Sequence, residues 1–397
     1  MNQEPILCRI CGGQIHAVKT HLDRDHKDWT IARYQAEYPD ALLLSEFMAA
    51  KVAERKAQLE SGAVAPRDTA GTVAETAMVE SAPALTLPAT KKPFHEVFGL
   101  PANKFTLSAK GKPVPINVFA PHSQQGLVPA IDEGYVFDPE ELKDVVLGYE
   151  LNMPVFVWGH KGSGKTELHE QICARTNRPL LRVQHTVNTE ESHIVGQWTV
   201  KGGQTHYELG PLPMAMLNGW TYLADEYDFG LPNVLAVYQP VLEGKPLVIK
   251  EADAANRIVK PHPNFRFVAT GNTNGSGDET GLYQGTSIQN SANFDRFGVT
   301  IHKKYMAEGD EIRILMQKTG VHEDDAKNLA KFAKQVREAY DGAKISDIIS
   351  PRALINGARL GVAKASFSKG IALAFTNKLS KVDQAVVEGV AQRIFGA

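Results

Sequence analysis

The run from Gly159 to Thr166 constrains this chain more than any other stretch. The apolar segment 154–158 before it predicts a short buried strand, and the segment 167–175 after it predicts a helix. A glycine-rich turn in this position is typical of a phosphate-binding loop, because glycine lets backbone N–H groups face oxyanions at a helix N-terminus. An ordinary glycine-rich turn is the simpler alternative, and the flanking strand and helix argue against it. The loop has the form Gly-x-x-x-x-Gly-Lys-Thr and consists of Gly159, His160, Lys161, Gly162, Ser163, Gly164, Lys165 and Thr166.

Within this loop, two side chains suit a nucleoside triphosphate. Lys165 is expected to reach the β- and γ-phosphates, and the Thr166 hydroxyl is expected to bind Mg²⁺. The apolar strand predicted at 220–224 ends in Asp225 and Glu226. A carboxylate at the end of such a strand can hold Mg²⁺, and a second one can orient the attacking water, so Asp225 suits the first role and Glu226 the second.

Three further polar residues later in the chain suit contacts with a nucleotide. A strand predicted at 265–270 leads to Asn272, whose amide suits a contact with the γ-phosphate or the water. Arg296 is a candidate for stabilising charge on the transferring phosphoryl group of a neighbouring subunit. Arg352 stands at a predicted helix start, after Ser350 and Pro351, where it could face the phosphates. Taken singly, each of these residues is more often a turn or surface residue.

Near the N-terminus, Cys8 and Cys11 form a Cys-x-x-Cys pair that is followed by His21 and His26. Two thiolates and two imidazoles can complete a tetrahedral Zn²⁺ site, and a short segment with little apolar content usually needs such a staple. His16 is a competing ligand, and the alternative is a pair of structural thiols beside surface histidines. We interpret the set Cys8, Cys11, His21 and His26 as a candidate zinc site.

This segment resembles the compact zinc finger of the Ros/MucR family. The resemblance implies DNA binding, and basic residues in the segment suit phosphate contacts, whereas acidic residues among them oppose such contacts. Docking on a protein and binding to DNA therefore both remain open. The matching residues are Cys8, Cys11, His21-Leu22, His26, Thr30, Tyr34 and Tyr38-Pro39. The basic residues are Lys19, Arg24, Lys27 and Arg33, and the acidic ones are Asp23, Asp25 and Asp28.

The composition and the net charge indicate which cellular compartment and which kinds of partner to expect. A net charge of −2 gives no global electrostatic case for binding nucleic acid or a membrane surface. The third cysteine, Cys173, is expected in the core, so the three cysteines predict no disulfide framework and favour a reducing compartment. No apolar run approaches a bilayer span, and residues 1–5 lack the pattern of a signal peptide. We expect a cytoplasmic protein without a membrane partner.

These patterns predict an α/β chain with four parts. Residues 1–60 form the zinc-finger-like module, with a helix from Leu42 to Leu59, and residues 61–92, rich in Ala, Thr, Pro and Ser, form a flexible linker. Residues 93–303 form a P-loop NTPase core. Residues 304–397 form a helical lid, because apolar residues such as Leu329, Phe332 and Val336 recur at helical spacing. Two hairpins are expected, at 198–207 and 247–259.

The order of the motifs resembles that of AAA+ ATPases, and residues from about 94 to 397 resemble the CobS family of aerobic cobaltochelatase subunits, in the chelatase/MoxR branch. This resemblance implies that Asn272 is the sensor-1 residue, Arg296 the finger acting on a neighbour's ATP, and Arg352 the sensor-2 arginine. It also implies a homo-oligomeric ring, with a hexamer as the expected form, hairpins that project toward the pore or a partner, and a partner with a von Willebrand A or metal-binding domain. The matching segments are Val97-Phe98-Gly99, Asp225-Glu226-Tyr227-Asp228, Pro261-His262-Pro263, Phe265-Arg266, Ala269-Thr270, Asn272-Thr273, Thr280-Gly281-Leu282-Tyr283, Gly285-Thr286 and Asp295-Arg296.

Three functions fit these features. The first is a ring-forming, Mg²⁺-dependent ATPase that remodels a partner complex, with metal insertion into a corrin ring as the case that the CobS resemblance implies. The second is a DNA-associated adaptor whose assembly ATP switches, or a MoxR-like chaperone of a phage or mobile element, targeted in either case by the finger. The third is a nucleotide-binding scaffold without turnover, which Glu226 and Arg296 argue against.

Overall fold

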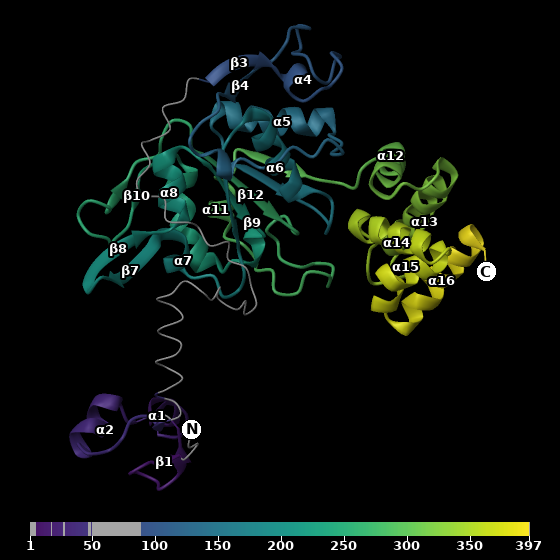
Figure 1. Cartoon of the computed structure of the whole chain (residues 1–397). Helices are drawn as coiled ribbons and strands as arrows, with labels where there is room; N and C mark the ends of the chain where they lie inside the picture. The colour runs from purple at the N-terminus through teal and green to yellow at the C-terminus, as the bar shows by residue number, and fades with distance from the viewer. Residues whose placement is uncertain (1–4, 17, 27, 47–48, 50–88, 397) are drawn as a thin grey trace. The chain divides into compact units, whose positions relative to one another are not determined.

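The structure is a computed structural model that describes residues 5–16, 18–26, 28–46, 49 and 89–396. The chain divides into two compact units, residues 1–79 and residues 80–397, and each is described by itself (Figure 1). The helix expected from Leu42 to Leu59 is absent at 42–45, and residues 46 and 49 are helical. The rest of that predicted helix, and the predicted linker as far as residue 88, lie outside the described residues.

The first unit is built around a small apolar core. Strand β1 (Ile6–Leu7) pairs antiparallel with β2 (Gln14–Ile15), and helices α1 (Val18–Asp25) and α2 (Ile31–Glu37) follow. Helix α2 begins at Thr30, whose hydroxyl accepts the Arg33 N–H at 3.2 Å. The buried residues are Cys8, Ile15, Val18, Leu22 and Tyr34. This core is too small to stabilise a domain without a further link.

The second unit begins earlier than the sequence predicts. Strand β3 (Ala89–Pro93) pairs along its whole length with β4 (Pro115–Phe119), so residues 89–92, which we expected in the linker, belong to a hairpin. The short helix α4 (Phe94–Val97) and the turn η1 (Gln125–Leu127) flank this hairpin. The backbone of β3 makes its strand hydrogen bonds to β4, which lies more than twenty residues further along the chain. The local sequence around β3 therefore does not predict a strand.

A parallel five-stranded sheet forms the centre of the second unit (Figure 1). Its order is β13-β5-β12-β9-β6, and every neighbouring pair is parallel. The carboxyl ends of all five strands therefore lie at one edge, which is where ligands bind in open α/β sheets. The strands are β5 (Val155–Trp158), β6 (Leu180–Gln184), β9 (Thr221–Asp225), β12 (Arg266–Gly271) and β13 (Val299–His302).

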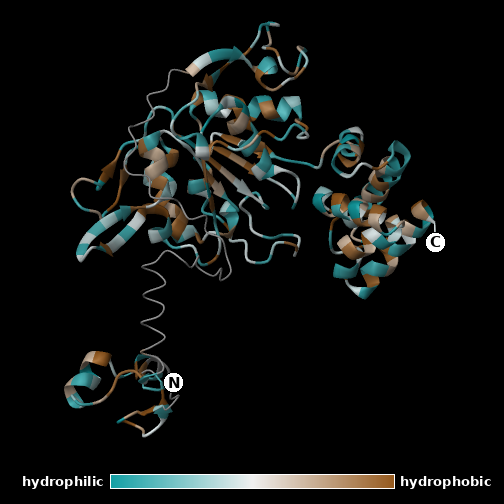
Figure 2. Cartoon of the chain, in the orientation of Figure 1, coloured by the Kyte–Doolittle hydropathy of each residue, from teal (hydrophilic) through white to brown (hydrophobic). Residues whose placement is uncertain are grey.

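Helices cover both faces of the sheet, and alternate strand residues enter two separate cores. On β9, Tyr222 packs with α8 (Pro211–Asn218), whereas its neighbour Leu223 packs with α5 (Pro139–Leu151) and α6 (Lys165–Thr176). The three central strands, β5, β9 and β12, are consequently almost entirely buried on both faces, and Figure 2 shows brown, hydrophobic residues in the sheet. The elements η2 (Tyr227–Phe229), α9 (Pro232–Leu235), η3 (Ala236–Tyr238), α10 (Gln239–Leu242) and α11 (Ser291–Phe294) complete this part.

Both predicted hairpins are present. Strand β7 (Gly196–Lys201) pairs with β8 (Gln204–Leu209) after the short helix α7 (Glu191–Val195), and β10 (Leu247–Val248) pairs with β11 (Ile258–Val259). The two hairpins lie side by side (Figure 1). The Trp198 indole N–H in β7 donates to the Glu251 carbonyl, between β10 and β11, at 2.9 Å.

The C-terminal part is helical, as the periodicity predicts. Its helices share one core that includes Leu329, Phe332 and Val336, and the Ser350 hydroxyl caps α14. Among the described residues, no helix combines the length and apolar character needed to cross a bilayer. The elements are α12 (Glu308–Thr319), α13 (Glu323–Asp341), α14 (Pro351–Ala363), α15 (Phe367–Ala374), η4 (Thr376–Lys378) and α16 (Lys381–Phe395).

Candidate functional site

The glycine loop joins β5 to α6 at the carboxyl edge of the sheet. Gly159 has φ +150°, and a Cβ there would lie 2.2 Å from the Lys303 carbonyl oxygen. Gly162 has φ +71°, and a Cβ there would lie 2.9 Å from the Ser350 side chain. Other residues are therefore excluded at both positions by neighbouring chain and by backbone conformation. The loop is a tight backbone turn that ends at the N-terminus of α6, as phosphate binding requires.

Lys165 is the first residue of α6 and its ammonium group lies inside this turn. Its Nζ donates to the Gly159 carbonyl at 2.8 Å, to the His160 carbonyl at 3.1 Å and to the Asn272 Oδ1 at 3.1 Å. Burial lowers the pKa of Lys165 to about 8, and the carboxylates of Asp228 and Asp225 oppose that change. The structure thus brings the predicted lysine and the predicted asparagine into direct contact across β5 and β12.

Asp225 ends β9, and its carboxylate is almost completely buried. It accepts a hydrogen bond from the Thr166 hydroxyl at 2.8 Å and another from the Thr270 hydroxyl. The Arg182 guanidinium also donates to it, through Nε at 2.8 Å. A threonine hydroxyl and a carboxylate in contact are hard oxygen donors of the kind that Mg²⁺ prefers. Thr166 and Asp225 therefore fit the predicted magnesium site.

Glu226 follows Asp225 in a left-handed conformation, with φ +52°. This conformation is uncommon for a residue with a side chain, and such residues gather at functional sites. The Glu226 carboxylate accepts a hydrogen bond from the Gln184 amide at 2.8 Å, and the Glu226 N–H donates to the Thr270 hydroxyl at 3.2 Å. The side chain is thereby held at the same edge of the sheet as Thr166 and Lys165.

Asn272 follows β12, and the turn that carries it is held by a buried carboxylate. Asp228 Oδ2 accepts the Asn272 and Thr273 N–H groups, both at 2.8 Å. Burial raises the pKa of Asp228, and these hydrogen bonds oppose that shift. Asp228 thus connects the turn after the Asp225-Glu226 pair to the turn that positions Asn272.

The two predicted arginines lie in different places. Arg352 is 73% exposed, and its guanidinium lies 3.7 Å from the Glu167 carboxylate in the first turn of α6, beside the glycine loop. Arg296 instead precedes β13, whose first residue, Val299, pairs with Val155 at the amino end of β5. Arg296 is therefore at the opposite edge of the sheet from Lys165, where it donates to Glu243 at 2.7 Å. The structure does not bring Arg296 to the site of its own chain.

Sequence reasoning assigned no role to four residues that hold the predicted groups in place. Thr270 and Asp228 are part of the segments that carry the family resemblance, so the sequence contained a signal for them. Arg182 and Gln184 have no such signal, because polar residues alternate in many strands and their partners lie on another strand.

The four predicted zinc ligands meet in the first unit. The candidate ligand atoms of Cys8, Cys11, His21 and His26 all lie within 4.8 Å of one another. Cys11 Sγ is 3.2 Å from His21 Nε2, and the buried His26 Nε2 has no hydrogen-bond partner in the part of the chain that the structure describes. The competing candidate His16 is outside this cluster and contacts the Ser45 hydroxyl at 3.0 Å. Two soft sulfur donors and two imidazoles fit Zn²⁺, and the His26 nitrogen without a partner among the described residues is one of these imidazole donors.

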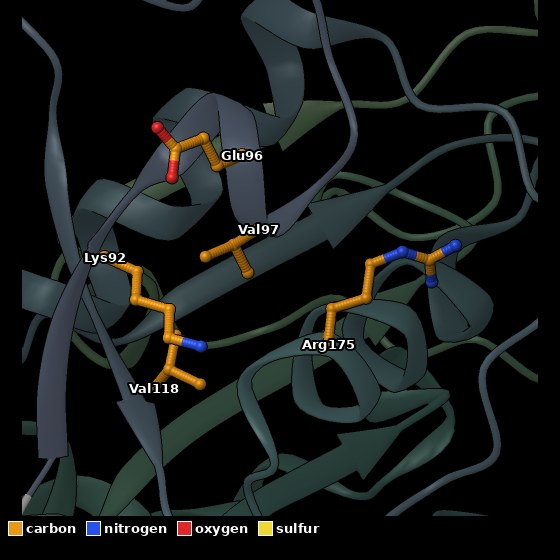
Figure 3. A pocket seen from close by; sticks show the side chains of 5 residues that line it. All are labelled: Lys92, Glu96, Val97, Val118 and Arg175. Atoms are coloured by element: carbon orange, nitrogen blue, oxygen red, sulfur yellow. The ribbon is translucent and has the colours of Figure 1, made fainter.

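A separate hollow lies beside the β3–β4 hairpin, and Figure 3 shows the side chains around it. The Arg175 guanidinium points away from the Lys92 ammonium, and it donates to the Asp132 carbonyl at 3.0 Å. None of the predicted phosphate- or magnesium-binding residues lines this hollow. Its lining residues are Lys92, Glu96, Val97, Val118 and Arg175.

The fold and the cluster at the carboxyl edge define an AAA+ P-loop ATPase. Residues 154–284 match the model of the AAA domain (dynein-related subfamily), and residues 311–395 match the CbbQ/NirQ/NorQ C-terminal model. The aerobic cobaltochelatase subunit CobS of Sinorhizobium sp. is 32% identical over 321 residues, which cover 78% of this chain and 92% of that protein. The chain therefore belongs to the CobS-like family of AAA+ ATPases. An uncharacterized protein of Staphylococcus haemolyticus is 28% identical over 55% of this chain and 82% of its own length.

The solved structures that match this chain have low sequence identity to it. A putative ATPase from Cytophaga hutchinsonii is 19% identical, with a TM-score of 0.36 over 68% of this chain and 83% of that one. The Holliday junction branch migration motor RuvB of Thermotoga maritima is 15% identical, with a TM-score of 0.39 over 65% of this chain and 74% of that one.

Proposed function

We propose that this ATPase hydrolyses ATP in a Mg²⁺-dependent reaction at the carboxyl edge of its sheet. The observation that carries the proposal is the double contact across three strands: Thr166 with Asp225, and Lys165 with Asn272. These contacts support the proposal because they join residues that are far apart in the sequence and to which we assign roles in binding phosphate, magnesium and water. Residues 159–166 cradle the phosphates through their backbone N–H groups.

Each side chain then has a distinct role. Thr166 and Asp225 hold the magnesium ion, which supplies charge neutralisation to the β- and γ-phosphates when it is bound. Glu226 orients the attacking water and accepts its proton. Asn272 contacts the γ-phosphate or that water, and Arg352 approaches the phosphates from the lid.

Arg296 acts on the ATP of a neighbouring copy of this chain. Its position at the amino edge of the sheet supports this role, because the length of β5 separates it from the glycine loop of its own chain. An arginine that serves the next subunit needs a head-to-tail contact between copies, which forms a ring when the rotation between copies closes; a hexameric ring is the form we propose. The Glu243 carboxylate, which contacts Arg296, keeps the guanidinium at that edge.

The work of the ring is the remodelling of a partner complex. The similar CobS protein is a subunit of an aerobic cobaltochelatase. This similarity supports a partner with a von Willebrand A or metal-binding domain. It also supports a role in metal insertion into a corrin ring. The two neighbouring hairpins expose Trp198, Val200, Val248 and Ile258, and we propose them as the contact with that partner.

The first unit is proposed to be a zinc-stabilised docking module, within residues 1–60, followed along the chain by a core at 89–303 and a lid at 304–397. Cys8, Cys11, His21 and His26 are the ligands. The Asp25 carboxylate, 2.7 Å from His21 Nδ1, fixes the tautomer that leaves Nε2 free for the metal. One basic residue of the module, Arg33, packs over the Trp29 ring at 4.4 Å.

The substitution Glu226→Gln tests the hydrolytic assignment. We expect ATP binding and ring formation to persist and turnover to fall by roughly 10²- to 10⁴-fold, because the amide cannot accept the proton from water. ATP hydrolysis and nucleotide affinity are measured on the full chain, with the exposed Glu388→Gln in α16 as the matched control. Turnover that persists in Glu226→Gln would remove Glu226 from this role.

A further inference from the structure

The tip of the glycine loop is held by side chains from outside it. The Lys161 N–H donates to the Tyr283 hydroxyl at 3.1 Å, and the same hydroxyl lies 2.9 Å from His160 Nδ1. On the other side, the Tyr305 hydroxyl donates to the Lys161 carbonyl at 3.0 Å. The Lys161 ammonium pairs with Asp347. The dipeptide His160-Lys161 thus has partners on both sides of its backbone.

Tyr283 belongs to a loop that starts at the predicted γ-phosphate sensor. We call residues 274–286 the bridging loop. Both of its ends are tied to Asp228: the carboxylate accepts the Thr273 N–H at 2.8 Å, and the carbonyl accepts the Ser287 N–H at 2.8 Å. Near its tip, the Asp278 carboxylate accepts the Tyr283 N–H at 2.8 Å. The bridging loop therefore runs from the turn that carries Asn272 to the glycine loop, and Asp228 holds both of its ends.

The direction of the hydrogen bonds follows from the donors present. Tyr283 is 7% exposed, and burial raises its pKa to about 12, so the hydroxyl keeps its proton at neutral pH. The hydroxyl oxygen accepts the Lys161 N–H. Among the described residues, His160 Nδ1 is the acceptor within reach of the hydroxyl proton. His160 is then neutral, with its proton on Nε2, and burial also lowers its pKa.

We propose that Tyr283 is a positioning residue for nucleotide binding, which holds His160-Lys161 so that the loop is shaped before the phosphates arrive. The inference rests on the proposed function, because it takes residues 159–166 as the phosphate site. Shaping a binding loop in advance raises affinity by removing the cost of ordering it on binding. The bridging loop also joins this tip to the turn held by Asp228 that carries Asn272. The same loop therefore connects the proposed phosphate-binding residues with the residue proposed to contact the γ-phosphate or the attacking water.

The substitution Tyr283→Phe removes the hydroxyl and retains the ring. We expect ADP to bind roughly three- to tenfold more weakly, the range that one lost hydrogen bond to a buried group gives. The KM for ATP should rise by a similar factor while kcat stays within about twofold, because Tyr283 touches no reacting atom. ADP affinity is measured by calorimetry on the full chain. The melting temperature without nucleotide is measured beside it and should fall by only about 2–4 °C, because the loop loses a single hydroxyl and the rest of the fold is retained.

The matched control is Tyr207→Phe. Tyr207 is also buried, but its hydroxyl has no hydrogen-bond partner among the described residues and lies on a hairpin, so ADP affinity should not change. A double-mutant cycle with His160→Ala adds a readout that general destabilisation would not move. If the two groups act together, Tyr283→Phe costs less affinity in the His160→Ala background than in the unmodified chain.

Two results would overturn the proposal: unchanged ADP affinity in Tyr283→Phe, or strictly additive effects in the cycle. Because ADP binding does not require hydrolysis, these results are independent of Glu226. A Glu226→Gln variant that still turns over, beside a Tyr283→Phe variant that binds ADP weakly, would refute the catalytic assignment and leave the positioning role supported.

Discussion

Deprotonation of Lys165 should weaken nucleotide binding at a pH close to the physiological range. The ammonium group is almost fully buried, and its three partners are two carbonyl oxygens and an amide oxygen, none of which carries a full charge. Burial therefore lowers the pKa of Lys165 to about 8. Phosphates placed beside this group stabilise its charged form, so nucleotide binding should raise the pKa again.

The size of the effect follows from this pKa. With a pKa of about 8, half of the free protein carries a protonated Lys165 at pH 8, and roughly one molecule in eleven does so at pH 9. If the bound state keeps its proton, affinity is full below pH 8 and falls as the pH rises. The expected loss is roughly fivefold between pH 8 and 9 and about tenfold between pH 7 and 9, or about 1.4 kcal/mol.

Calorimetry with ADP between pH 7 and 9.5 measures this loss. Titrations in buffers of different ionisation enthalpy should also show uptake of roughly half a proton per site at pH 8. The control is Lys165→Arg, which stays charged throughout this range and should give a flat profile, whatever its absolute affinity. A flat profile in the unmodified protein, or release of protons at pH 8, would refute the reasoning that burial brings the titration of Lys165 into this range.

Two other predictions address the subunit contact and the metal. Arg296→Ala should lower turnover by roughly a thousandfold or more, and mixing it with Glu226→Gln subunits should restore part of the activity, because each variant supplies what the other lacks. Mixtures that stay inactive in an ATPase assay would argue against action between subunits. The first unit should bind one equivalent of Zn²⁺, measured by elemental analysis. Cys8→Ser should abolish that binding, whereas His16→Ala should not, because His16 contacts Ser45 outside the cluster. Zinc retained by Cys8→Ser would contradict the ligand set.

Much of the site was predictable because its parts are local patterns. The strand, glycine loop and helix around Lys165 are contiguous in the chain, and so are the strand and acid pair at Asp225-Glu226. Both hairpins and the helix that starts after Ser350 were also predicted from short-range signals. The first strand of the second unit was missed, because β3 is stabilised by pairing with β4, more than twenty residues away.

The supporting residues could not be predicted from such patterns. Arg182 and Gln184 alternate along β6 like many polar residues at a sheet edge, and only the adjacency of β6 and β9 directs them at Asp225 and Glu226. Likewise, the contact between His160 and Tyr283 joins residues 123 positions apart. No spacing rule connects them, because their proximity depends on the path of the bridging loop.

The sequence by itself determined which local motifs this protein carries: a glycine loop, an acid pair and a Cys/His set, each made of residues near one another in the chain. Only the tertiary structure decided the order of the strands, and hence that Lys165 meets Asn272 whereas Arg296 faces away from its own site. The physical reason is that strand order depends on hydrogen bonding and packing between distant segments, which local propensity does not specify.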